Sequence, residues 1–218
     1  MTDEIEAYWR LRLDSCKQAL EKNNFKAFVA RDAQAAKNLT LQQILPGLDV
    51  RSAAWGDSMT MLATGILDDI KKLVNVHLLQ TFADDTPRRE IIERRRQALL
   101  VDLFLSGSNA VTESGQLVNL DMVGNRVAPI AFGPRHVILY IGRNKITADL
   151  TTAMQRVKQV AAPMNAIRHP NLKTPCQKTG RCMDCNSPDR ICNVWSIVEK
   201  SYPRHRIQVV LINADLGL

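Results

Sequence analysis

The stretch from Phe25 to Trp55 reads FKAFVARDAQAAKNLTLQQILPGLDVRSAAW. Its apolar runs at Phe25–Ala30 and Val50–Trp55 predict two buried strands, and the segment Arg31–Leu45 between them predicts a helix that ends before Pro46-Gly47. A strand, a helix and a second strand in this order predict neighbouring parallel strands with a right-handed crossover. The stretch therefore predicts an α/β fold with a mostly parallel, Rossmann-like sheet and helices on both faces.

The same patterns continue outward along the chain. Further strands are predicted at Val74–Leu79, Val101–Leu105, Gln116–Leu120, His136–Ile141 and Ile207–Asn213. Further helices are predicted at Asp3–Asn24, 59–73, Asp149–Ala162 (stopped by Pro163) and Asn193–Ser201. We therefore expect an N-terminal helix at residues 1–24 and an α/β domain at residues 25–218, which contains a cysteine-rich segment at residues 170–193.

The composition bounds the classes of function. The chain has 218 residues and a formal net charge of +7, which favours an anionic partner. Aromatic residues make up only 5%, and no helix-turn-helix pair is visible, so nucleic acid is not the expected partner. No apolar run has the length of a membrane span. The acidic opening Met-Thr-Asp-Glu-Ile-Glu is unlike a signal peptide, so we expect a cytoplasmic protein.

Four of the five cysteines lie between Thr174 and Asn193, in the spacing C-x5-C-x2-C-x6-C. Two thiols two residues apart can reach one metal ion or one face of a cluster, and the surrounding prolines and glycine let the outer thiols close the site. The candidate metal ligands are Cys176, Cys182, Cys185 and Cys192. Disulfides and plain packing are the competing explanations, but the segment lacks apolar periodicity and a reducing compartment is expected.

The identity of the metal stays open between two candidates. The uneven spacing favours a [4Fe–4S] cluster, because the corners of a cluster are separated in space. Zinc is the alternative, although structural zinc sites commonly use two C-x2-C pairs and this segment has one. The fifth cysteine, Cys16, lies on the apolar face of the predicted N-terminal helix and is expected in the core.

Small, amide-rich and hydroxyl-rich turns follow several of the predicted strands. Open α/β sheets place their ligands at such strand ends, where free backbone N–H groups and hydroxyls can receive an anion. The candidate anion-binding residues are Gly56, Asp57, Ser58, Thr60, Gly107, Ser108, Asn109, Gly124, Asn125, Arg126, Asn144 and Lys145. At Ser58 an ordinary helix cap explains the pattern equally well.

These turns also resemble those of a known family. The sequence SGSNAVTESG from Ser106, the turn Gly124–Val127, the triplet Phe132–Pro134 and the segment Val137–Lys145 look like the LUD-domain family, which is associated with lactate utilisation. Trp55–Thr60 resembles the first glycine–serine turn of that family, and the resemblance covers most of the chain from about residue 10 onward. The subgroup with a C-terminal cysteine segment is the most similar.

The resemblance implies a sheet similar to that of CoA transferases and sugar-phosphate isomerases. In CoA transferases of that superfamily a glutamate in a Glu-Asn-Gly turn attacks the acyl group, and Glu113 lies in a similar turn, with Ser114 where the asparagine would be. Glu113 is therefore a candidate catalytic residue. No second half with CoA-binding features is visible, so a turn or ligand-contact role for Glu113 is the alternative. The sequence shows no flavin or nicotinamide site, and no G-x-G-x-x-G motif follows a predicted strand, so the chain alone is not expected to dehydrogenate lactate.

Two functional hypotheses follow. In the first, a cytoplasmic LUD-domain protein of lactate or organic-acid utilisation holds an iron–sulfur cluster, binds a small anionic ligand and exchanges electrons with a partner protein. In the second, zinc staples the cysteine segment, and the sheet serves a transferase, isomerase or ligand-binding role with a carboxylate, a phosphate or a CoA ester. The oligomeric state stays open, a homo-oligomer included.

Overall fold

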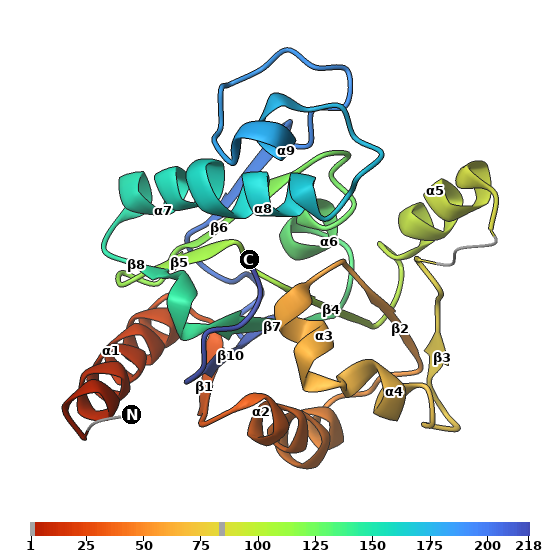
Figure 1. The fold of residues 1–218 in the computed structure, drawn as a ribbon. Helices are drawn as coiled ribbons and strands as arrows, with labels where there is room; N and C mark the ends of the chain where they lie inside the picture. The colour runs from red at the N-terminus through yellow and green to blue at the C-terminus, as the bar shows by residue number, and fades with distance from the viewer. Residues whose placement is uncertain (1–2, 83–85) are drawn as a thin grey trace.

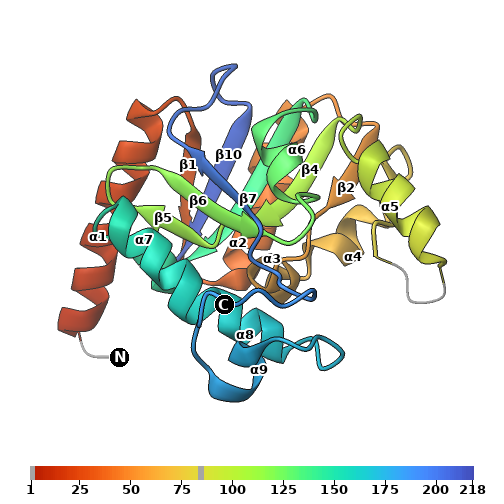
Figure 2. The same ribbon diagram turned by 90° about the horizontal axis from the view of Figure 1, so that it is seen from above.

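The protein is described by a computed structural model at residues 3–82 and 86–218, and within these residues two β-sheets and several helices are stacked in layers (Figures 1 and 2). The strands of the larger sheet are all parallel, as the sequence predicts. Their order in space is β1 (Lys26–Ala30), β10 (Ile207–Ile212), β7 (His136–Gly142), β4 (Leu103–Gly107), β2 (Ser52–Trp55) and β3 (His77–Leu78).

The central strands are hydrophobic on both sides because both faces of the sheet are covered. In β7, Val137, Leu139 and Ile141 belong to one hydrophobic core, and Ile138 and Tyr140 belong to the other. Successive side chains of a strand point to opposite faces, so a strand covered on both faces becomes a continuous apolar run. This is why the runs were recognisable as buried strands.

Helices cover one face of the large sheet. They are α2 (Ala33–Leu39), its π-helical and 3₁₀ continuations Thr40–Ile44 and Leu45–Gly47, α3 (Met59–Thr64) and α4 (Ile66–Ile70). Asp32 begins α2, since its carboxylate accepts a hydrogen bond from the Ala35 N–H at 2.7 Å. The helix predicted at 59–73 is two short helices because Gly65 ends α3 in the left-handed conformation, at φ 69°.

The other face differs from the expected layer of helices. It packs against α1 (Asp3–Lys22), α6 (Val127–Ala131) and a second, smaller sheet. The strands of this sheet are, in spatial order, β8 (Ile146–Thr147), β5 (Ala110–Thr112), β6 (Leu117–Asp121) and β9 (Val194–Val198). Leu13, Cys16 and Leu20 of α1 enter the same core, so the N-terminal helix is part of the sheet's packing. Met1 and Thr2, also assigned to that helix, lie outside the described residues.

A last layer covers the small sheet. It contains α7 (Leu150–Arg156), the π-helical turn Val157–Ala161 and α8 (Ala162–Ile167), followed by α9 (Pro175–Thr179) in the cysteine segment. Ala153 and Val157 pack on Ala110 and Val118 of the small sheet. The predicted stop at Pro163 is wrong, because the π-helical turn lets the proline take a first-turn position of α8, where its missing N–H costs nothing.

The helix predicted at Asn193–Ser201 is also wrong, because these residues form β9. This strand pairs antiparallel with β6, with Leu117 opposite Val198 and Asp121 opposite Val194. The run Val-Trp-Ser-Ile-Val is short and rich in β-branched residues, and an available strand edge favours it as a strand. Its apolar periodicity alone does not distinguish the two structures.

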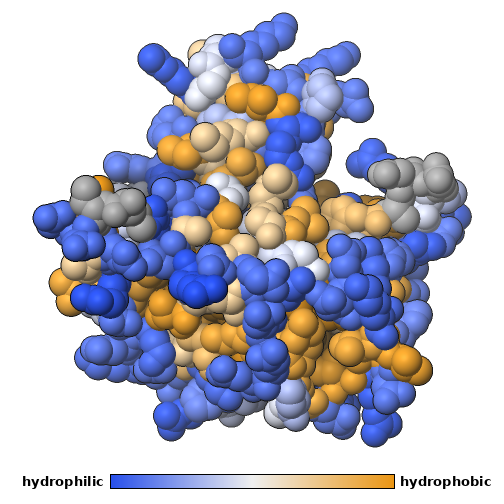
Figure 3. Space-filling view, turned by 60° about the horizontal axis from the view of Figure 1, so that its bottom comes forward, coloured by the Kyte–Doolittle hydropathy of each residue, from blue (hydrophilic) through white to orange (hydrophobic). Residues whose placement is uncertain are grey.

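Two elements complete the fold: α5 (Arg88–Gln97) beside β2 and β3, and the 3₁₀ turn Arg143–Lys145 after β7. The face seen in Figure 3 is largely hydrophilic, with smaller hydrophobic patches between charged side chains. Within residues 3–82 and 86–218, no helix combines the length and the apolar character that crossing a bilayer requires.

Candidate functional site

The polar turns meet at one edge of the large sheet because β10, β7, β4 and β2 are neighbours and run parallel. The turns after β2 and β4 are packed against each other without a gap. The Gly56 N–H donates to the Leu105 carbonyl at 2.9 Å, and a Cβ on Gly107 would collide with the Ser58 hydroxyl. A glycine at position 107 is therefore needed to bring the two turns together.

A cavity of about 620 Å³, which we call the polar cavity, opens above these strand ends. Most of the predicted anion-binding residues line it: Asp57, Ser58, Gly107, Ser108, Asn109, Asn125, Arg126 and Lys145. Of the described residues, Gly56, Thr60, Gly124 and Asn144 lie in the same turns but not in the cavity wall. The structure thus brings together residues that are up to 88 positions apart, from Asp57 to Lys145.

Basic side chains that were not predicted as anion-binding residues also line the polar cavity. Arg95 of α5 lines it, and so do Arg168 and His169 just after α8. Arg168 pairs with Asp57 at 2.9 Å, which ties the α8 layer to the turn after β2. Burial lowers the pKa of Arg95, while the nearby Asp57 and Asp121 carboxylates oppose that shift. The arginines of α5, which are Arg88, Arg89, Arg94, Arg95 and Arg96, can be read from the sequence. The sequence does not predict that α5 lies beside the polar cavity.

Ser58 serves as the cap of α3. Its hydroxyl accepts a hydrogen bond from the Met61 N–H at 3.2 Å, so the ordinary-cap explanation of this serine is satisfied. The hydroxyl hydrogen is not used by that bond and can be donated into the polar cavity, which the residue lines.

Arg126 lies under the polar cavity in a buried hydrogen-bond network. Its guanidinium donates to Asp121 Oδ1 at 3.1 Å, Asn119 Oδ1 at 3.0 Å and Asn109 Oδ1 at 2.7 Å, and also to the carbonyls of Gly107 and Leu120. A guanidinium has five N–H donors, and protein acceptors occupy them here. Arg126 therefore holds the turns in place and contributes positive potential rather than a free hydrogen-bond donor.

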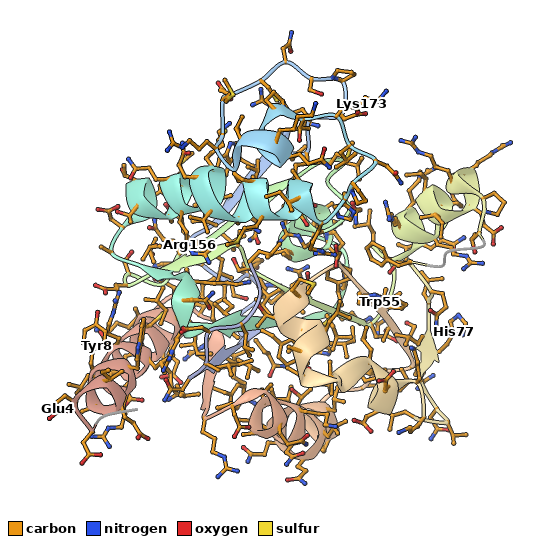
Figure 4. The ribbon with its side chains drawn as sticks, viewed as in Figure 1. Glu4, Tyr8, Trp55, His77, Arg156 and Lys173 are labelled. Atoms are coloured by element: carbon orange, nitrogen blue, oxygen red, sulfur yellow. The ribbon has the colours of Figure 1, made fainter. Side chains whose placement is uncertain are left out.

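Lys145 is 4% exposed and lines the polar cavity. Among the described residues, no hydrogen bond or ion pair is made by its amine. The pKa of Lys145 is lowered to about 7, mainly by burial and in addition by the charges of Arg156 and Arg126. Arg156 lies between α7 and the strand ends, where it donates to the Asn144 carbonyl at 3.1 Å (Figure 4).

The depressed pKa predicts a pH dependence of stability. Between pH about 7 and the unfolded value of about 10.4, the unfolded chain binds a proton that the folded chain has lost, so stability rises with pH; below pH 7 both states are protonated and this slope disappears. Lys145→Met should remove up to about 1.4 kcal/mol per pH unit of that slope. Urea unfolding of both proteins at pH 7.5 and 9 checks this, and parallel pH slopes would contradict it.

Glu113 lies apart from the other candidates. It is in the turn between β5 and β6, and its carboxylate pairs with Arg12 of α1 at 2.5 Å, with a side-chain exposure of 46%. Among the described residues, the polar cavity is lined without it. Glu113 therefore forms a surface ion pair with Arg12. Its catalytic role remains a prediction.

The Glu113→Gln variant tests that role. Because exposed ion pairs contribute little, we expect a loss of less than about 1 kcal/mol in the free energy of unfolding and unchanged ligand binding in the polar cavity. Urea unfolding and calorimetric titration with pyruvate measure the two quantities. A variant that stays folded but no longer binds pyruvate would contradict this expectation. It would mean that Glu113 contacts the ligand although it does not line the polar cavity.

The four cysteines of the C-terminal segment line one small cavity, which we call the thiol cavity. All four thiols are free and partly buried. The polar and thiol cavities share two wall residues, Ala162 and Ile191, so one layer of side chains separates them. Cys16 lies apart from these four, on the buried face of α1, where burial raises the pKa of its thiol to about 12.

Cationic side chains surround the thiol cavity. Arg190 donates to the carbonyls of Cys185 at 2.7 Å and Cys192 at 3.1 Å, and it pairs with Asp184 at 2.9 Å. Lys158 pairs with the same Asp184 at 2.7 Å. Burial lowers the pKa of Lys158, but the bond to Asp184 and the nearby sulfurs of Cys182 and Cys192 raise it more, so the net shift is upward.

The donor set of the thiol cavity fits a soft metal centre in its chemistry. Four unpaired thiols face one space, and thiolate sulfur is a preferred ligand of such centres. Within residues 3–82 and 86–218, no three potential ligands already surround a common ion position. Ligation would therefore require the loop to contract around the centre, as folding and binding are often coupled in metal sites.

Comparison with known proteins gives a family and a fold. A family model described as LUD domain matches residues 13–212. Among solved structures, a DUF162 family protein from Deinococcus radiodurans is similar, with a TM-score of 0.53 and 10% sequence identity over 94% of this chain and 98% of that chain. No curated protein matches. At 10% identity the structural similarity concerns the fold alone.

Proposed function

The chain belongs to the LUD domain family, and on this premise we propose that it serves lactate or related organic-acid utilisation by holding a [4Fe–4S] cluster beside a site for a small organic anion. Cys176, Cys182, Cys185 and Cys192 would hold the cluster. The polar cavity would receive the anion. A bound cluster supplies a one-electron redox centre, and the electron would pass to or from a partner protein.

One observation carries the proposal: the polar and thiol cavities share Ala162 and Ile191. A redox centre and an organic ligand separated by a single layer of side chains can influence each other electrostatically, because charges interact strongly through a low-dielectric protein layer. The free thiols and the cationic neighbours Lys158 and Arg190 support the same assignment.

The chain's own residues explain how an anion would be bound. Arg126 contributes positive potential to the polar cavity, Lys145 brings its amine to it, and Ser58 brings a hydroxyl group. Arg168 and His169 flank it from the α8 side. A carboxylate is held well by such donors, because charge-assisted hydrogen bonds are stronger than neutral ones.

The test couples the two sites. Protein prepared without oxygen is reduced with dithionite, and its electron paramagnetic resonance spectrum is recorded with and without pyruvate or L-lactate. We expect an iron–sulfur signal whose g values shift when the acid binds, and no shift in the Lys145→Met variant, which removes the amine that lines the polar cavity. If the iron–sulfur signal does not change although calorimetry shows that the acid is bound, the coupling is contradicted. If the protein contains stoichiometric zinc, the cluster is contradicted.

A further inference from the structure

Lys145 is unusual because, within residues 3–82 and 86–218, no acidic side chain forms an ion pair with its buried amine. Lysine side chains are rarely fully buried without one, since an unpaired buried charge is costly. The salt bridges among the described residues leave Lys145 out, and its nearest charged influences are the guanidinium groups of Arg156 and Arg126. With a pKa of about 7, a large fraction of the side chain is the uncharged amine at neutral pH.

The backbone is shaped to admit this side chain. Gly217 has a positive φ of 70°, and a Cβ there would come within 3.0 Å of the Lys145 amine and would collide with the Thr60 hydroxyl. The segment that follows β10 thus passes directly over the amine and needs a glycine at its point of closest approach. The amine is held between this segment and the polar cavity, which the side chain lines.

An uncharged amine is a nucleophile toward carbonyl carbon. Burial is the main cause of the lowered pKa of Lys145, and the charges of Arg156 and Arg126 add to it. These arginines also impose a positive potential on the space around the amine, so a carbonyl compound that carries a negative charge is favoured there. In a 2-oxo acid the carboxylate is bonded directly to the carbonyl carbon. Such an acid therefore brings both the negative charge and the reactive carbon to the space around Lys145.

We propose that Lys145 forms an imine with the carbonyl carbon of a 2-oxo acid bound in the polar cavity. This inference rests on the proposed function, in which the polar cavity receives a small organic anion. The amine lone pair adds to the carbonyl carbon, and one amine proton moves to the former carbonyl oxygen. The resulting carbinolamine then loses that oxygen as water, with the second amine hydrogen. One amine and one carbonyl group give one imine and one water, with no oxidation or reduction.

Reductive trapping tests the imine. The protein is incubated with pyruvate and sodium borohydride, which converts an imine into a stable secondary amine, and the modified residue is located by mass spectrometry of peptides. We expect one modification per chain, at Lys145, with a rate that reaches half its maximum near pH 7 rather than above pH 10. L-Lactate, which has no carbonyl carbon of the same kind, should give no modification.

Variants separate the site from general lysine reactivity. Lys145→Met, which suits burial, and Lys145→Arg, which keeps a long basic side chain but has no amine that can form the imine, should both reduce trapping to the background level. Lys72→Arg should trap as the natural protein does, because Lys72 is an exposed lysine whose partner is Asp69. Thermal unfolding of each variant confirms that it is folded before its trapping is compared.

Failure of the inference is distinguishable from failure of the proposed function. If calorimetry shows that pyruvate binds in the polar cavity but borohydride modifies no lysine, or modifies surface lysines alone, the imine is excluded and the anion site remains. If pyruvate neither binds nor is trapped, both the imine and the small-acid part of the proposed function are overturned.

Discussion

The Cys185→Ala variant, prepared without oxygen, is expected to lose the iron and sulfide of the protein almost completely. Cys185 is half of the C-x2-C pair, and its carbonyl is held by Arg190, so it has a fixed place in the wall of the thiol cavity. A cluster ligated by four thiolates tolerates the loss of one poorly, because the vacated iron corner is open to exchange and hydrolysis. Iron and sulfide assays and the visible absorbance measure the loss.

The matched control is Cys16→Ala. Cys16 is the remaining cysteine. It lies on the buried face of α1, and its thiol donates to the Thr112 carbonyl at 3.8 Å. Its replacement should leave the iron content unchanged and cost about 1 kcal/mol of stability through a small cavity. Equal iron content in both variants would mean that the C-terminal thiols do not ligate the iron.

The second large effect concerns stability. Arg126→Met should lower the free energy of unfolding by about 3 to 5 kcal/mol, because it leaves the buried Asp121 carboxylate without its cationic partner. Asn119, Asn109 and two backbone carbonyls would lose a donor at the same time. Urea unfolding measures the effect, and the polar cavity should lose its affinity for pyruvate in the same variant, since the network holds its floor.

Two comparisons make the Arg126 result specific. Arg135→Met removes an exposed arginine that pairs loosely with Asp102, at 3.6 Å, and should cost less than about 1 kcal/mol. The double variant Arg126→Met, Asp121→Asn should recover part of the loss, because the unpaired charge is gone. If Arg126→Met unfolds at the same urea concentration as Arg135→Met, the buried network contributes nothing to the fold.

The large sheet could be predicted from the sequence because its strands are covered on both faces and therefore stand out as apolar runs. The position of the polar turns at one edge followed from the parallel order of those strands. β9 could not be predicted, because Val-Trp-Ser-Ile-Val satisfies both periodicities and the partner strand β6 is more than 70 positions away. Local pattern carries no information about an edge supplied by a distant segment.

The candidate site was predictable only in part. Ser108, Asn109 and Lys145 were visible as polar residues after strands, but the low exposure of Lys145 depends on the distant segment around Gly217. The sequence likewise predicted Arg126 as an anion-binding residue, whereas in the structure its N–H groups donate to protein acceptors. Arg168 and Asp57 are 111 positions apart, so their pairing is a property of the fold alone.

The most direct measurement is the iron and acid-labile sulfide content of the natural protein prepared without oxygen. We predict about four iron and four sulfide per chain, with a broad absorbance near about 400 nm, from a cluster held by the four thiols of the thiol cavity. A colourless preparation that is free of iron and contains one zinc per chain would contradict the cluster and the electron-transfer role with it.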